Sequence, residues 1–265
     1  MRLKITHTTQ YDYDTPVTYG LQQVRLTPAS GAHQTVVNWT VDIDGGQREL
    51  TFHDEFQNET MLVQADAGVH RIALTVSGEV ETHCSDGVFG AVYGPAPLWL
   101  FLQSTPRTTA GRAIQKLSKT VANATDVLSG LHDLSREILA AVPYIKDNTR
   151  ANTTAEQAFS AGGGVCQDHA QIFIAAARHA GIPARYVSGY LMMNDRVDQD
   201  ASHAWAEAHV DGLGWVGFDV SNGISPDERY VRIATGRDSH DAAPITGLRL
   251  GKGNESMIVS LQIQQ

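Results

Sequence analysis

Residues 162–170 read Gly-Gly-Gly-Val-Cys-Gln-Asp-His-Ala, and the next ten continue as Gln-Ile-Phe-Ile-Ala-Ala-Ala-Arg-His-Ala. The three glycines allow positive φ angles and let another group come close to the backbone. The alanine-rich run has good helix formers and no internal breaker, and Gly181 and Pro183 follow it as stop signals. The pattern predicts a loop and then a helix that begins at or within one residue of Cys166.

A cysteine at a helix start is well placed to act as a nucleophile. Unpaired N–H groups and the positive end of the helix dipole favour a thiolate there. A lone cysteine is more often a small buried apolar residue. Here it follows glycines, and two partners lie downstream: His203 in Ser-His-Ala-Trp-Ala-Glu and Asp219 in Gly-Trp-Val-Gly-Phe-Asp. Together these features favour a Cys-His-Asp arrangement.

Composition excludes several classes of protein. The 265 residues are 42% hydrophobic and 18% charged, which is ordinary for a globular protein. A formal charge of −9 without a Lys/Arg cluster argues against nucleic acid or an anionic membrane as partner. The chain start has no apolar signal stretch and residues 98–102 are too few to span a bilayer, so we expect a cytosolic protein. Cys84 and Cys166 form no disulfide framework and are expected to be reduced, although a single bridge between them stays open.

Strand patterns dominate the first hundred residues. Apolar and polar residues alternate in 3–13, 37–43 and 72–76, with turn residues between these segments. This predicts an antiparallel β-sandwich domain over residues 1–104. His83 and Cys84 lie side by side here, but no second His/Cys pair completes a zinc site, so no chemistry is expected in this domain.

The periodicity changes after residue 104. Thr105-Pro106 marks an expected helix start, a second helix follows Thr125-Asp126, and the Thr153 to Glu156 capping pattern opens a third. Strands are expected at 184–191, 203–210, 230–234 and 257–263. We therefore expect an α+β fold in which residues 105–265 form a catalytic core, with the cysteine helix packed on an antiparallel sheet.

Strand register predicts that His203 and Asp219 meet. Residues 203, 205, 207 and 209 share one face, while alanines at 204, 206 and 208 share the other and are expected to pack on a helix. A three-residue hairpin loop at 211–213 pairs Val210 with Gly214, which puts Asp219 one diagonal step from His203. In such a set the thiolate attacks an acyl carbon, the histidine moves the proton, and the carboxylate orients the ring.

These motifs resemble those of the bacterial transglutaminase-like family, whose core has the papain-like cysteine protease fold. The resemblance also covers Gly-Ile-Pro-Ala-Arg-Tyr at 181–186 and Gly-Arg-Asp at 236–238. The first domain is similar to the β-rich domain that precedes this core in bacterial members. The resemblance implies Cys166, His203 and Asp219 as the catalytic triad. Where the family reads Asp-Pro-Thr-Asn-Gly, residues 219–223 read Asp-Val-Ser-Asn-Gly and lack the rigid proline.

The oxyanion donors are only partly predicted. Papain-like proteases carry a glutamine six residues before the cysteine, where this chain has Ser160. The backbone N–H of Cys166 is one expected donor, and the second is open between Tyr144 and Gln167. Trp205 and Asn222 are further candidates for contacts with substrate.

The leading hypothesis is a hydrolase that cleaves a peptide or protein amide through a Cys166 thioester. The alternatives are a protein transglutaminase, a non-catalytic binding module of the same fold, and a zinc site of Cys166, His169 and His203 without an obvious fourth ligand. Residues 194–202 are polar and acidic and are expected to form a mobile, hydrated loop, which favours hydrolysis. No metal or cofactor is expected, and the oligomeric state stays open.

Overall fold

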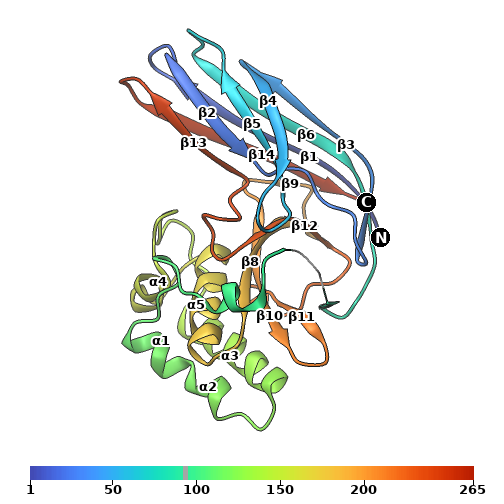
Figure 1. Ribbon diagram of the computed structural model, residues 1–265, viewed down its shortest axis with the longest axis vertical. Helices are drawn as coiled ribbons and strands as arrows, with labels where there is room; N and C mark the ends of the chain where they lie inside the picture. Colours follow the sequence, from blue (N-terminus) through green and yellow to red (C-terminus); the bar gives the residue numbers. More distant parts are fainter. Residues whose placement is uncertain (92–94) are drawn as a thin grey trace.

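The computed structural model describes residues 1–91 and 95–265, arranged as a β-sandwich above a mixed core (Figure 1). One sheet of the sandwich has the order β3-β6-β1-β14-β9 and the other β13-β2-β5-β4. The strands are β1 (Arg2–Tyr13), β2 (Tyr19–Val24), β3 (Gln34–Asp44), β4 (Gly46–His53), β5 (Glu59–Ala65), β6 (Arg71–Thr82), β9 (Asp198–Gln199), β13 (Ile245–Leu250) and β14 (Glu255–Gln264). The predicted antiparallel sandwich is confirmed.

The core combines helices with a third antiparallel sheet. The sheet has the order β12 (Tyr230–Gly236), β8 (Ala184–Leu191), β10 (His203–Val210), β11 (Gly214–Phe218) and β7 (Val88–Gly90). The helices are the short 3₁₀ helix η1 (Leu98–Leu102), α1 (Arg112–Leu117), α2 (Lys119–Ala122), α3 (Val127–Ala141), α4 (Ala155–Ala161) and α5 (Cys166–His179). The α+β fold class is thus as predicted. Across residues 1–91 and 95–265, no helix is both long and apolar enough to cross a bilayer.

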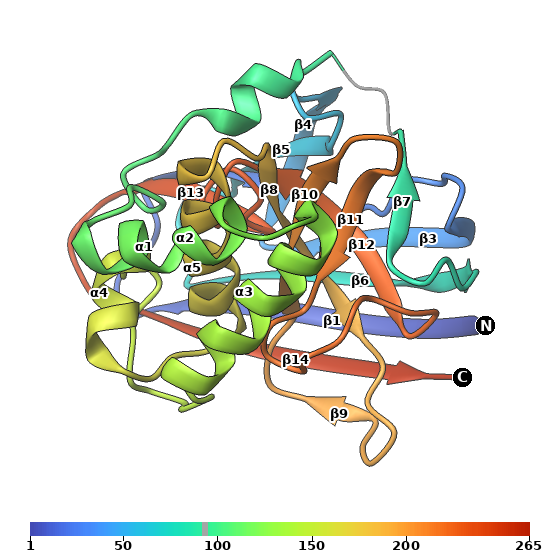
Figure 2. The same cartoon turned by 90° about the horizontal axis from the view of Figure 1, so that it is seen from below.

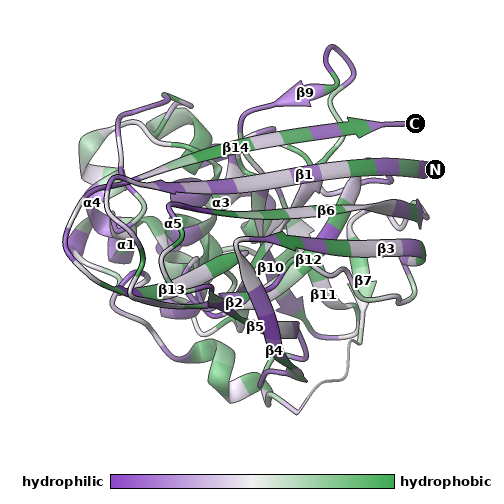
Figure 3. Cartoon of the chain, turned by 90° about the horizontal axis from the view of Figure 1, so that it is seen from above, coloured by the Kyte–Doolittle hydropathy of each residue, from purple (hydrophilic) through white to green (hydrophobic). Residues whose placement is uncertain are grey.

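The strand alternation buries one face of each sandwich sheet. Along β6 every second side chain is buried, as period-2 geometry requires. Leu74 and Val76 of β6 pack between the sheets against Met61 and Val63 of β5. Figure 3 shows hydrophobic and hydrophilic residues alternating toward the C-terminal end of β14.

Membership of the sheets does not follow the predicted division at residue 104. β13 pairs with β2, and β14 pairs with β1, so residues expected in the 105–265 core complete the sandwich. Conversely, β7 lies before residue 104 but pairs with β11 of the core sheet. Figure 2 shows β14 beside β1, with both chain ends at the same side. A strand pattern predicts the strand but not its partner, which is why the sequence placed β14 in the wrong layer.

Two of the expected helix starts shift. α1 begins at Arg112 because Thr105 and Thr108 bond each other in a turn: the Thr105 N–H donates to Thr108 Oγ1 at 3.1 Å and the Thr108 N–H to Thr105 Oγ1 at 3.2 Å. The capping box of α4 is centred on Thr154, one residue later than predicted. The start of α3 is as predicted, with Asp126 accepting from two backbone N–H groups.

Helix α5 packs on the sheet as expected from the small residues of β10. The side chains of Ala204, Ala206 and Ala208 are buried in one cluster with those of α5. Phe173 of α5 stacks on Phe218 of β11 with ring centroids 4.8 Å apart. The small alanine side chains let α5 approach β10 closely. This close packing fixes the position of Cys166, at the start of α5, relative to the sheet.

Candidate active site

The start of α5 is held by a carboxylate from its own first turn. Asp168 is fully buried, and its Oδ2 accepts from the Val165 N–H at 2.9 Å and from Thr149 Oγ1 at 2.5 Å. Gly164 makes room for it, because a Cβ at position 164 would lie 2.8 Å from both Asp168 Cβ and Oδ2. This arrangement fixes the backbone immediately before Cys166. Neither Asp168 nor Thr149 was predicted; the only signal was an acidic residue in the first turn of the helix.

The structure brings Cys166, His203 and Asp219 together. Cys166 is the first residue of α5 and is partly exposed. The His203 Nε2 atom lies 2.6 Å from Asp219 Oδ2, and the same ring is close enough to Cys166 for the cysteine to raise its pKa. Since Asp219 occupies Nε2, the nitrogen left for the sulfur is Nδ1. The predicted hairpin register also holds, with Val210 opposite Gly214.

Asp219 is surrounded by hydrogen-bond donors. Besides His203, its Oδ2 accepts from Tyr230 Oη at 2.7 Å and from Asn222 Nδ2 at 2.7 Å. Burial raises the pKa of Asp219, but the hydrogen bonds and charge of His203, followed by those donors, hold it below its ordinary value. Asn222, expected to contact substrate, is instead bound to Asp219. Tyr230 comes from a distant strand and belongs to no motif, so its contact with Asp219 was not predicted.

The electrostatics favour a charged imidazole. Burial lowers the pKa of His203, but the hydrogen bond and charge of Asp219, together with the influence of Cys166, outweigh burial and raise the pKa to about 10. The His203 and Asp219 side chains are only 12% and 1% exposed, so solvent screens the pair weakly. An imidazolium at neutral pH is the natural counter-ion of a thiolate.

The two oxyanion candidates differ in position. Tyr144 forms an isolated parallel β-bridge with Gly164, beside the nucleophile. Burial and then the negative charges of Cys166 and Asp219 raise the pKa of the Tyr144 phenol, which stays half exposed. The side chain of Gln167 instead donates to the Ala151 carbonyl oxygen at 3.3 Å. Of the two side chains, Gln167 is engaged with Ala151, whereas the Tyr144 phenol lies within the electrostatic influence of Cys166.

Trp205 is buried behind His203. Its side chain is 1% exposed, and its ring centroid lies 6.4 Å from that of His203 and 5.4 Å from that of Tyr230. It lines a cavity in which neither Cys166 nor His203 takes part. The expected contact between Trp205 and a substrate on Cys166 is therefore replaced by a supporting position.

The geometry of His169 excludes the zinc alternative. Its Nε2 lies 2.7 Å from the Val142 carbonyl oxygen, so Nε2 carries the proton, and its Nδ1 lies 2.7 Å from Ser221 Oγ. Burial lowers the pKa of His169, which keeps this ring neutral. Both nitrogens are engaged and neither is left to ligate a metal. The single-bridge alternative is also excluded, because Cys84 and Cys166 are both free thiols.

Known proteins share both halves of this chain. The family described as "Transglutaminase-like superfamily" matches residues 115–220, and "Bacterial transglutaminase-like N-terminal region" matches residues 3–81. An uncharacterised protein of Mycobacterium leprae is 27% identical, covering 99% of this chain and 98% of the relative. Another from Mycobacterium bovis is 26% identical, covering 97% and 90%.

A solved structure shares the whole fold. A crystal structure described as "a Putative Cysteine Protease from Cytophaga hutchinsonii" superposes with a TM-score of 0.80 at 23% identity, covering 100% of this chain and 90% of that one. The first family match contains the cysteine, histidine and aspartate described above, and the second covers most of the sandwich. The chain belongs to the transglutaminase-like superfamily, in the form that carries the bacterial N-terminal region.

Proposed function

We propose that the protein hydrolyses a peptide or protein amide through a thioester on Cys166. The observation that carries this proposal is the 2.6 Å contact between His203 Nε2 and Asp219 Oδ2, on a ring whose pKa is raised by Asp219 and Cys166. The description of the Cytophaga hutchinsonii structure as "a Putative Cysteine Protease" is consistent with it.

The chemistry follows from these positions. The Cys166 thiolate attacks the carbonyl carbon, the C–N bond breaks, and the His203 imidazolium gives its proton to the departing amine. Water then attacks the thioester while His203 takes up its proton, and the C–S bond breaks to release the acid. Asp219 keeps the Nε2–H bound, so that Nδ1 exchanges the proton in both steps.

The developing oxyanion needs donors that are otherwise unpaired. The Cys166 N–H lies in the first turn of α5 and has no carbonyl one turn back within the helix. We propose the Tyr144 hydroxyl as the second donor, because Tyr144 bridges to Gly164 next to the nucleophile.

Access of water favours hydrolysis over amine transfer. Asp195, Asp198 and Asp200 are exposed in the segment before β10. β9 ties this segment to β14 at Asp198 and Gln199, so the expected mobile loop is anchored in its middle. A transglutaminase must hold an amine where bulk water, at about 55 M, cannot compete. The exposed acids attract an amine electrostatically, which keeps transamidation as the alternative to be tested.

The test is turnover of a peptide library with and without a primary amine, read by mass spectrometry. Free acid products should dominate at millimolar amine and should vanish in Cys166→Ala. His203→Ala should cost about 10²–10⁴-fold and Asp219→Asn less. Cys84→Ala is the matched control and should retain full activity. Faster amine incorporation than acid release would favour the transglutaminase, and saturable peptide binding without turnover would favour a binding module.

A further inference from the structure

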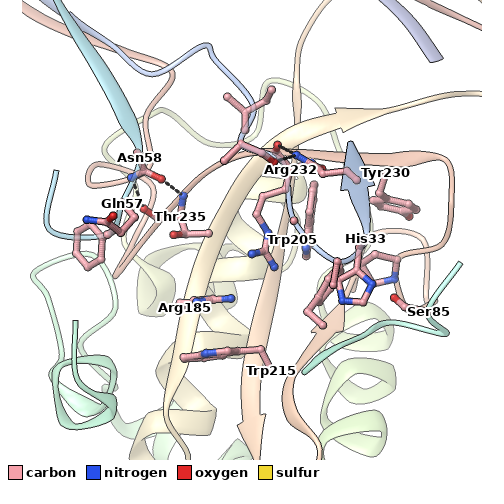
Figure 4. A pocket seen from close by; sticks show the side chains of 18 of the residues that line it. His33, Gln57, Asn58, Ser85, Arg185, Trp205, Trp215, Tyr230, Arg232 and Thr235 are labelled. Carbon is pink, nitrogen blue, oxygen red and sulfur yellow. Dashed lines mark hydrogen bonds between the residues drawn. The ribbon is translucent and has the colours of Figure 1, made fainter. Parts of the chain in front are cut away.

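A cavity of about 570 Å³ lies between loops of the sandwich and the face of the core sheet opposite α5 (Figure 4). Its floor is formed by side chains of β8, β10, β11 and β12, and His33 closes it from the sandwich side. Its volume lies within the range of small-molecule sites. The lining includes aromatic rings from Trp205, Trp215 and Tyr230.

Three buried side-chain nitrogens of this cavity have no hydrogen-bond partner among the described residues: Trp205 Nε1, Arg185 Nη2 and His33 Nε2. Trp205 is 1% exposed, and its Nε1 atom has no hydrogen-bond partner in residues 1–91 and 95–265. An indole N–H can only donate, and a buried donor without a partner destabilises the fold. Figure 4 shows Trp205 among the side chains that line the space. The cavity thus presents an N–H group that a bound acceptor would satisfy.

The floor also carries an excess of positive charge. Arg185 and Arg232 share one buried carboxylate: Arg185 Nε donates to Glu207 Oε2 at 2.7 Å, and Arg232 Nη2 to Glu207 Oε1. Burial lowers the pKa of Arg185 to about 10, and Arg232 adds to this while Glu207 opposes it. Arg185 lies 4.0 Å from the Trp215 ring centroid, so its guanidinium plane is fixed. Arg185 and Arg232 together with Glu207 leave one positive charge, which a single negative charge on a bound ligand would neutralise.

The acids on the cavity wall do not supply that charge. Asp227 is bound by its own neighbour, with Arg229 Nη2 at 2.6 Å from Asp227 Oδ2. Glu59 also lines the wall but forms no ion pair with either arginine in the described part of the chain. The excess is one charge, which a monocarboxylate matches better than a phosphate dianion.

We propose that this cavity binds a small organic monocarboxylate that carries an aromatic ring system. The carboxylate would accept from Trp205 Nε1 and face the guanidinium of Arg232, while the rings would lie among Trp215, Tyr230 and Phe101. The site is separate from Cys166 and does not depend on the proposed amide hydrolysis. Binding is therefore measured in Cys166→Ala protein, where turnover cannot interfere.

The experiment compares three probes with the same rings by titration calorimetry: 2-naphthylacetate, its neutral amide and 2-naphthylethylamine. The carboxylate should bind at least about tenfold more tightly than the amide, since a charged hydrogen bond is the stronger one, and the amine should not bind. Arg232→Gln should remove most of that preference, and Trp205→Phe should weaken the carboxylate several-fold. Arg48→Gln, an exposed arginine of β4, is the matched control and should change nothing.

Equal affinity for carboxylate and amide, preference for the amine, or absence of saturable carboxylate binding at millimolar concentration would overturn the proposal. Unchanged carboxylate affinity in both cavity variants would overturn the location. If Arg232→Gln unfolds, Trp205→Phe still tests the location because it keeps the aromatic packing, and the three-probe comparison on the unaltered cavity tests the charge.

Discussion

Replacing Asp219 with asparagine should lower the pH at which the His203 ring loses its proton. In the parent protein the pKa of His203 is raised from 6.5 to about 10. That rise corresponds to on the order of 5 kcal/mol in favour of the imidazolium, and the His203–Asp219 pair is buried enough that little is lost to screening. Burial of the ring lowers this pKa, while the hydrogen bond and the charge of Asp219 both raise it. Without Asp219 the effect of burial is opposed less strongly, so the pKa of His203 should fall below its value in the parent.

The NMR signals of the His203 ring report this step. Their chemical shifts are measured from neutral to strongly alkaline pH, and the signals are assigned by their loss in His203→Ala. In the parent the His203 signals should move near pH 10, where the imidazolium disappears. In Asp219→Asn they should move at lower pH. A parent His203 that titrates near its ordinary value of about 6.5, or identical profiles for the two proteins, would refute the reasoning.

The free energy of unfolding should depend on pH through the same shift in the pKa of His203. Because the folded pKa of His203 is raised, the ion pair stabilises the fold fully below about pH 6.5, and this contribution is lost as pH rises through about 10. The destabilisation caused by Asp219→Asn in urea unfolding should therefore shrink above pH 10.

Three further predictions concern the surroundings of the site and the sandwich. Burial lowers the pKa of His7 to about 4, so only the unfolded chain binds a proton between about pH 6.5 and 4, and stability falls with pH there. Between neutral pH and pH 4.5, the free energy of unfolding measured in urea should fall by about 2–3 kcal/mol less in His7→Gln than in the parent. Tyr230→Phe removes the 2.7 Å hydrogen bond to Asp219 and should lower kcat/KM about tenfold with KM little changed; equal kcat values would show that the hydroxyl has no positioning role. Gly164→Ala should destabilise the fold by about 1–3 kcal/mol and slow Cys166 alkylation, because its Cβ would lie 2.8 Å from the buried Asp168 carboxylate. Gly31→Ala, which has open space at its Cβ, is the control for thermal unfolding.

Local patterns predicted the positions of Cys166, His203 and Asp219. The helix start at Cys166 followed from glycines and helix formers within one stretch, and the contact of His203 with Asp219 followed from the register of a tight hairpin. Both depend on residues near one another in sequence. The contact of Tyr230 with Asp219 depends instead on where β12 lies in the sheet, which no local pattern encodes. The turn at Thr105 shows a different limit, since hydroxyl groups there satisfy backbone N–H groups that a helix would otherwise use.

The position of β14 in the sequence delays completion of the sandwich during synthesis. Gln264 of β14 pairs with Lys4 of β1. During synthesis β1 therefore stays without this partner until β14, which follows the other strands in the sequence, has left the ribosome. Until then β1 can pair with β6 but keeps its other edge unsatisfied, and such an edge is a template for association between nascent chains. Closing contacts between distant parts of a chain is slow because the loop entropy must be overcome first. The core sheet and its helices, whose strands are all complete by residue 236, can therefore assemble while the sandwich that precedes them in the sequence is still open.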